Sequence, residues 1–169
     1  MKKNKIINCC FIFTSFLIMS TTSFSQEIKS MQYDELSSRI LVSNDTLYVL
    51  NFWATWCKPC IGELPYFEQS NKDYKSAPVK IILVNLDFNK SMNSVTIPFV
   101  QNKKMMSEII HLTDTDPNKW INKVESTWSG ALPATIMYKN QTKLFFKEGP
   151  INQDELNTTL NINLAGSKK

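Results

Sequence analysis

The sequence predicts an α/β fold in which helices flank a central mixed β-sheet. Residues 46–53 and 79–86 are two nearly continuous apolar runs, which is typical of strands buried on both faces of a sheet. After residue 133 come two short strand-like segments around a turn, and then a helix-like segment. Strands that alternate with helices and end in a hairpin and a helix are typical of a layered α/β domain.

The sequence up to residue 104 predicts three helices. Residues 31–42 carry apolar side chains on one side, which predicts an amphipathic helix. A second helix is expected over residues 58–75, with a kink at Pro65 because proline cannot donate a backbone hydrogen bond. Residues 92–104 predict a third helix, inside which Pro98 falls.

Capping signals predict two helices in the second half. Asp116 and Pro117 suit the N-cap and first position of a helix that runs through about residue 125. Asn152, followed three residues later by Glu155, resembles a capping box that opens a last helix to about residue 164. The remaining strands are expected at residues 108–112, 134–138 and 142–147.

The N-terminal residues have the pattern of a secretory signal peptide. Three lysines within the first five residues precede an apolar stretch, residues 6–19, and then small and polar residues up to Ser25. We expect residues 1–25 to be cleaved and residues 26–169 to form a single exported domain, in the periplasm or another extracytoplasmic compartment. A retained membrane anchor is the alternative.

Cleavage would simplify both the cysteine count and the charge. The chain has four cysteines, of which only Cys57 and Cys60 would remain. Of the 19 basic residues, three lie in residues 1–25, so 16 would face 15 acidic residues. This near balance, without a basic run, gives no reason to expect nucleic-acid binding.

The two remaining cysteines form a Cys-x-x-Cys pair at the junction of a predicted strand and a predicted helix. The free N–H groups and the dipole at a helix N-terminus favour a thiolate, and Lys58 adds a nearby positive charge. We therefore expect Cys57 to be the attacking nucleophile and Cys60, one turn further, to be the resolving thiol. Pro59 fixes the backbone between them.

Other uses of a Cys-x-x-Cys pair fit the sequence less well. A disulfide that closes so small a loop removes little chain entropy, so a purely structural role would stabilise little. A zinc site needs further ligands, and only His111, to which we assign no catalytic role, is left to help. A c-type haem site needs histidine after the second cysteine, where this chain has Ile61. No metal or cofactor is expected.

The motifs of residues 33–164 resemble the thioredoxin superfamily. The segment FWATWCKPC with Pro65 resembles its active site and helix, and Leu132-Pro133 resembles the loop that carries its cis-proline. Residues 138–156, with Gly149, resemble its hairpin and final helix. NFWATWC followed by Glu-Leu-Pro is most similar to the extracytoplasmic TlpA/ResA-like branch. The resemblance implies a thioredoxin-like fold with an inserted segment before the cis-proline strand.

The resemblance also assigns roles around the two cysteines. Trp56 would form part of the rim of the substrate-facing surface, Lys58 would tune the redox potential, and Pro59 would complete that surface. Pro133 would be cis, with its backbone neighbours pairing with an extended substrate peptide, and Leu132 would make this loop apolar. Each of these residues also has a structural interpretation, as core packing, a solvated lysine or a first-turn proline.

Asn51 and Glu63 depart from the thioredoxin pattern together. Asn51 stands where classical thioredoxin has a buried aspartate, and an amide cannot carry a proton as a carboxylate does. Glu63 lies three residues after Cys60, on the same side of the predicted helix. The hypothesis is that Glu63 is partly buried and moves protons during resolution. The alternative is a solvated helix glutamate.

These residues predict an enzyme that exchanges its Cys57–Cys60 dithiol with protein thiols and disulfides. The resemblance implies net reduction, with electrons from a membrane-bound donor and with cytochrome c maturation as a plausible setting. A disulfide oxidase or isomerase is the first alternative, because the motif alone does not set direction. A peroxiredoxin-like peroxidase and a non-catalytic binding module are the others.

Overall fold

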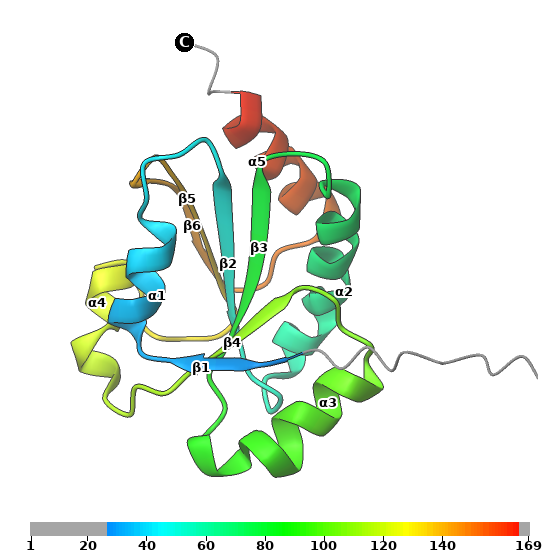
Figure 1. The fold of residues 1–169 in the computed structure, drawn as a ribbon, viewed down its shortest axis with the longest axis vertical. Coiled ribbons are helices and arrows are strands. Elements are labelled where there is room, and N and C mark those ends of the chain that lie inside the picture. Colours follow the sequence, from blue (N-terminus) through cyan, green and yellow to red (C-terminus); the bar gives the residue numbers. More distant parts are fainter. Residues whose placement is uncertain (1–26, 166–169) are drawn as a thin grey trace, which may run out of the picture.

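The computed structural model describes residues 27–165, so the expected signal peptide lies outside the described residues. Figure 1 shows one central sheet with helices packed on both of its faces. Within residues 27–165, no helix is both long and apolar enough to cross a membrane.

The described strands form a single six-stranded sheet in the order β1-β4-β3-β2-β5-β6. The strands are β1 (Lys29–Met31), β2 (Leu47–Trp53), β3 (Val79–Asn85), β4 (Glu108–Leu112), β5 (Ala134–Lys139) and β6 (Thr142–Glu148). The first four pair in parallel, whereas β5 is antiparallel to β2 and β6 is antiparallel to β5. The expected mixed sheet is confirmed, with β2 near its centre.

The helices divide between the two faces of the sheet. They are α1 (Tyr33–Ile40), α2 (Lys58–Asp73), α3 (Ile97–Asn102), α4 (Ile121–Val124) and α5 (Gln153–Ala165), with the short segments η1 (Asn89–Ser91), η2 (Met92–Thr96) and η3 (Pro117–Lys119). Side chains of α1 and α4 pack into one hydrophobic cluster, and those of α2, α3 and α5 pack into the other. Figure 1 shows the same division.

Residues of the central strands alternate between the two clusters. Ile82 packs in the cluster of α1, while the next residue, Leu83, packs in the cluster of α2 and α5. Both side chains are almost completely buried. Both faces of β2 and β3 are covered over most of their length, and of these residues only Lys80, near the start of β3, is exposed. This burial explains their nearly continuous apolar runs.

The structure corrects the prediction for residues 31–42. Met31 belongs to a short strand, β1, and α1 covers only Tyr33–Ile40. β1 pairs with β4, about eighty residues further along the chain, with Met31 opposite Leu112. A three-residue strand has no periodicity of its own, so only this distant pairing defines it.

Two predicted helices are interrupted. The segment 92–104 begins as a π-helical stretch and becomes α3 at Ile97, directly before Pro98, where a missing N–H costs nothing. In the segment 116–125, Asp116 does act as a cap, accepting a bond from the Asn118 N–H over 3.1 Å. The helix it caps is the short η3, and α4 follows separately.

The parallel strands bring three loops together at one edge of the sheet. The carboxyl ends of β2, β3 and β4 all lie at this edge, because the three strands run in the same direction. Cys57 follows β2, Asp87 follows β3 and Asp114 follows β4. In open α/β sheets, ligands bind outside the carboxyl ends of the strands. The candidate site is therefore at this edge.

Candidate active site

Cys57 and Cys60 form a disulfide at the start of α2, with their Cα atoms 5.3 Å apart. Cys57 is the N-cap of the helix, and its sulfur accepts a bond from the Cys60 N–H over 3.3 Å. The Cys57 side chain keeps a small exposed fraction of 6%, whereas Cys60 is fully buried. Of the two cysteines, only Cys57 retains solvent access, so reversible thiol–disulfide exchange would begin at this residue.

The residues beside the disulfide form an exposed rim. Trp56 is 62% exposed although it is large and apolar. Lys58 and Pro59, between the two cysteines, are exposed as well. The structure thus brings the predicted rim residues to the surface around Cys57, where an incoming polypeptide would meet them.

The Leu132–Pro133 peptide bond is cis, as expected. The Pro133 carbonyl accepts a bond from the Gly149 N–H over 2.8 Å, which ties this loop to the end of β6. Gly149 has a φ of 95°, in the left-handed region that favours glycine. β5, which begins directly after Pro133, pairs with β2, so this loop lies near the segment that leads to Cys57.

Glu63 lies on the buried side of α2, the helix that begins at the disulfide, as the proton-transfer hypothesis requires. Its side chain is 2% exposed and lies three residues after Cys60, on the same buried side of α2. Oε1 accepts a bond from Asn51 Nδ2 and Oε2 accepts one from the Ile151 N–H, each over 2.7 Å. Burial raises the pKa of Glu63 to about 6, although both hydrogen bonds oppose the shift. The alternative of a solvated glutamate is wrong.

Asn51 is the partner that links Glu63 to the sheet. Its Nδ2 also donates to Thr135 Oγ1 over 3.2 Å, while its Oδ1 is buried without a partner in the described part of the chain. Asn51 and Thr135 face each other across β2 and β5. Asn51 thus stands at the position of the thioredoxin aspartate, but it carries no carboxylate of its own. Its amide donates a hydrogen bond to the carboxylate of Glu63 instead.

Asp87 anchors the loop before Cys57 and was missed in the sequence. Its Oδ1 accepts bonds from both the N–H and the hydroxyl of Thr55, each over 2.9 Å. Its Oδ2 accepts from Thr96 Oγ1 and from Asn85 Nδ2, over 2.7 and 3.0 Å. The carboxylate is 4% exposed. The available signal was the alternation of polar residues at positions 85, 87 and 89, directly after a buried strand.

His111 belongs to the same polar network. Nδ1 lies 3.1 Å from Asn85 Oδ1, and Nε2 lies 2.8 Å from Asn89 Oδ1. Burial lowers the pKa of His111, and the carboxylate of Asp87 opposes this shift. Among residues 27–165, no three His, Cys, Asp or Glu side chains are grouped as the ligands of a metal ion would be.

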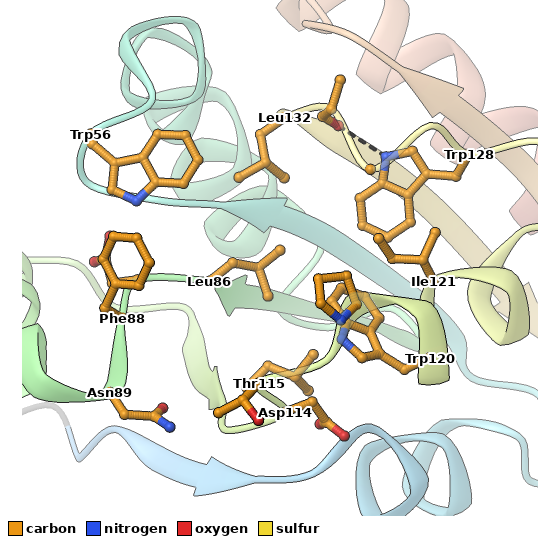
Figure 2. Close-up of a pocket in the computed structure, with 15 residues that line it drawn as sticks. Trp56, Leu86, Phe88, Asn89, Asp114, Thr115, Trp120, Ile121, Trp128 and Leu132 are labelled. Atoms are coloured by element: carbon orange, nitrogen blue, oxygen red, sulfur yellow. Dashed lines mark hydrogen bonds between the residues drawn. The ribbon is translucent and has the colours of Figure 1, made fainter.

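A pocket of about 450 Å³ opens beside the disulfide. Figure 2 shows Trp56 and Phe88 at one end of it and Trp120, Ile121 and Trp128 at the other. Trp120 and Trp128 are each 4% exposed, so most of their surface belongs to the hydrophobic core. Their remaining edges line this pocket.

The comparison with known families identifies the chain. The profile of the AhpC/TSA family matches residues 24–144, which span most of the domain. The chain belongs to the AhpC/TSA family. The predicted resemblance to thioredoxin-like proteins is thereby confirmed.

Curated relatives of this AhpC/TSA-family chain match it over one short segment. The thiol-disulfide oxidoreductase ResA of Oceanobacillus iheyensis is 51% identical over 39 residues, which are 23% of this chain and 20% of the relative. ResA of Bacillus subtilis is 49% identical over 41 residues, 24% of this chain and 23% of the relative. The matches therefore span about a fifth of the length of these relatives.

Solved structures are similar over a larger part of the chain. StoA from Bacillus subtilis is 25% identical, with a TM-score of 0.55, over 69% of this chain and 84% of StoA. The dsbF protein of MTB is 28% identical, with a TM-score of 0.54, over 73% of this chain and 83% of dsbF. These similarities establish the thioredoxin-like fold of this member of the AhpC/TSA family.

Proposed function

We propose that the protein is an exported thiol–disulfide oxidoreductase that exchanges its Cys57–Cys60 pair with protein substrates. The observation that carries this proposal is the asymmetry of the pair. Cys57 is the N-cap of α2 and retains solvent access, whereas Cys60 is fully buried behind it. The names of the ResA relatives, thiol-disulfide oxidoreductases, support the same activity.

The reaction in the reducing direction has two exchange steps. The Cys57 thiolate, stabilised at the helix N-terminus, attacks one sulfur of a substrate disulfide. A mixed disulfide forms, and the other substrate sulfur leaves as a thiolate that takes up a proton. The Cys60 thiol then loses its proton and attacks Cys57, which releases the second substrate thiol. The substrate gains two electrons and the protein keeps the Cys57–Cys60 disulfide.

Glu63 is the group that would accept the Cys60 proton. Its pKa of about 6 lies near neutrality, which suits a group that must both take up and release a proton. Asn51 can serve either protonation state, because its Oδ1 is buried without a partner in residues 27–165. Rotation of the amide would replace the N–H that binds the carboxylate with an oxygen that accepts from the carboxylic acid.

The finer assignment is a reductase that acts outside the cytoplasm. The signal-peptide pattern of residues 1–25 supports export, and disulfides persist in such compartments. The electrons would come from a membrane-bound donor, and apo-cytochrome c thiols would be a substrate, both by analogy with the ResA-like branch. The equilibrium potential decides the direction. About −270 mV supports a reductase, and about −120 mV supports an oxidase.

Trapping of the mixed disulfide tests the activity itself. We expect the Cys60→Ser variant to accumulate a covalent complex with a disulfide-containing protein, because no resolving thiol remains. The Cys57→Ser variant is the matched control and should form no such complex. Mass spectrometry of the intact adduct identifies the attached cysteine. Turnover of disulfides by Cys57→Ser at the wild-type rate would contradict the proposal.

A further inference from the structure

The pocket beside the disulfide is continuous with the two elements that would contact a substrate. Trp56, next to Cys57, forms one wall, and Leu132, next to the cis-proline, forms part of another. Figure 2 shows these two side chains on the same side of the pocket, with Leu86 below them. A polypeptide held at Cys57 and along Leu132 would therefore pass directly over the opening.

The far wall of the pocket is preformed. The indole N–H of Trp128 donates to the Ala131 carbonyl over 2.9 Å, which fixes the orientation of this ring, as Figure 2 shows. Trp120 lies 5.6 Å from Trp128 and 5.9 Å from Phe52, measured between ring centroids. A rigid aromatic wall loses little conformational entropy when it receives an apolar group.

The near wall is largely exposed apolar surface, approached by Lys90, whose Nζ lies 6.0 Å from the centroid of the Phe88 ring. Phe88 is 67% exposed, and Trp56 is 62% exposed. Single exposed apolar residues are common, but two large aromatic side chains at the mouth of one pocket form a patch that favours contact with another apolar group. The patch includes Trp56, the direct neighbour in sequence of Cys57, which is the cysteine of the pair that retains solvent access.

The charges of the lining restrict what can enter. Asp87 and Asp114 are among the lining residues, which include no lysine or arginine. One oxygen of Asp114 accepts a bond from the Tyr33 N–H over 2.7 Å. A carboxylate that entered this pocket would lose its hydration and face two like charges with no cation in the lining, since Lys90 lies at the mouth, over Phe88. Both effects disfavour its binding.

We propose that this pocket is a specificity pocket for a bulky, uncharged apolar side chain, aromatic in the best case, that flanks the reactive cysteine of a polypeptide substrate. The inference rests on the proposed function and adds the class of substrate to it. The loops after β3 and β4 supply most of the pocket, so the segment between β3 and β5 selects the substrate. Exchange chemistry stays with Cys57 and Cys60.

Peptides that differ at one position test this pocket. Each peptide carries one cysteine, coupled as a disulfide to thionitrobenzoate, and has phenylalanine, alanine or glutamate at one of the two positions before or after it. Release of the coloured thiolate by the reduced protein gives the second-order rate constant. At one of these positions we expect phenylalanine to react about tenfold faster than alanine, and glutamate to react slowest.

A pocket-filling substitution provides the matched test. Thr115 is exposed and lines the pocket, so Thr115→Phe should occupy the opening and reduce the advantage of phenylalanine to less than about twofold. Asn122→Phe, exposed on α4 outside the lining, should preserve the advantage. Asn122→Phe should react with free dithionitrobenzoate at the wild-type rate. For Thr115→Phe the alanine peptide, whose side chain does not fill the pocket, gives the reference rate.

The outcomes separate the pocket from the chemistry. Equal rates for the phenylalanine and alanine peptides at every position, with Cys57 still required, would overturn the pocket and leave the proposed function intact. Persistence of the advantage in Thr115→Phe would overturn it too. Release of thionitrobenzoate by Cys57→Ser at the wild-type rate would instead contradict the proposed function.

Discussion

The carboxyl group of Glu63 is buried, and each of its two oxygens accepts a hydrogen bond. Asn51 and the Ile151 N–H each donate to it, yet burial remains the largest influence and raises its pKa to about 6. The nearby Lys147 lowers this pKa and Glu155 raises it, and both have smaller effects. A buried acid with this pKa has a measurable signature in both rate and stability.

The first prediction concerns the rate of the resolving step. In the wild type, the rate of mixed-disulfide resolution should rise with pH and inflect near pH 6, as Glu63 becomes able to accept a proton. Glu63→Gln should remove this inflection and slow resolution by about 100-fold at neutral pH. Rapid-mixing measurements across the pH range test this, and an unchanged profile would exclude Glu63 as the proton carrier.

The same group makes stability depend on pH. Its folded pKa of about 6 exceeds the ordinary value of 4.5, so protonation favours the folded state. This contribution is fully present below about pH 4.5 and is lost as the pH rises through 6. The difference is about 2 kcal/mol between pH 4 and pH 8.

Urea unfolding of the oxidised form should show this loss in the wild type but not in Glu63→Gln. Glu35→Gln, on the exposed side of α1, should behave as the wild type.

Asp87 contributes through the loop that it holds. Replacement of Asp87 by alanine would leave the Thr55 N–H, the Thr96 hydroxyl and the Asn85 amide without their acceptor. We expect destabilisation by about 3 kcal/mol in urea unfolding, because each buried unpaired donor is costly. Asp73→Ala, at the exposed end of α2, is the control and should change stability by less than about 0.5 kcal/mol. Equal stability of the two variants would contradict the structural role of Asp87.

At the scale of elements, α5 begins with an N-terminal cap formed by two residues that are three positions apart in the sequence. Asn152 Oδ1 accepts a bond from the Glu155 N–H over 2.9 Å. Asn152→Ala should therefore destabilise the protein by about 1 kcal/mol. Thr158→Ala, on an exposed position inside the helix, should be neutral or slightly stabilising. Urea unfolding of both variants measures the difference, and an undiminished stability of Asn152→Ala would show that the cap contributes nothing.

Elements with a strong local signal could be predicted, and elements defined by distant contacts could not. β3, β4 and the β5–β6 hairpin follow from apolar runs and turn residues, and their predicted bounds differ from the observed ones by at most one residue. β1 exists only because it pairs with β4. The predicted helix 92–104 is a π-helical stretch followed directly by α3, which begins at Ile97, one residue before Pro98.

The same distinction applies to the site. The cysteines, the rim and Glu63 were found because they stand in or near one short motif. The cis-proline was found because Leu132-Pro133 resembles the corresponding loop of the family. Asp87 is bonded to Thr55 across 32 positions, and no spacing in the sequence indicates such a contact. The pocket was missed for the same reason, because its walls come from the loops after β2, β3 and β4, from the loop before β5 and from α4.

At the scale of the whole molecule, the two hydrophobic clusters share one sheet. Ile82→Ala and Leu83→Ala each remove a buried side chain, from opposite clusters, and each should cost about 2–5 kcal/mol. Leu144→Ala, on the 41% exposed position of β6, should cost less than about 1 kcal/mol. Urea unfolding measures all three. If either β3 variant were as stable as the β6 variant, the corresponding face would not be a tightly packed core.

The two edges of the sheet bear on self-association. β1 has only three residues and includes the exposed Lys29, while the opposite edge, β6, carries Lys143 and Lys147. These two lysines pair with Glu125 and Glu155. A strand from a second copy that paired with β6 would have to displace these ion pairs. One that paired with β1 would find only three residues to bond with. Both features disfavour edge-to-edge pairing. We therefore expect this fold to resist fibril-like growth at high concentration.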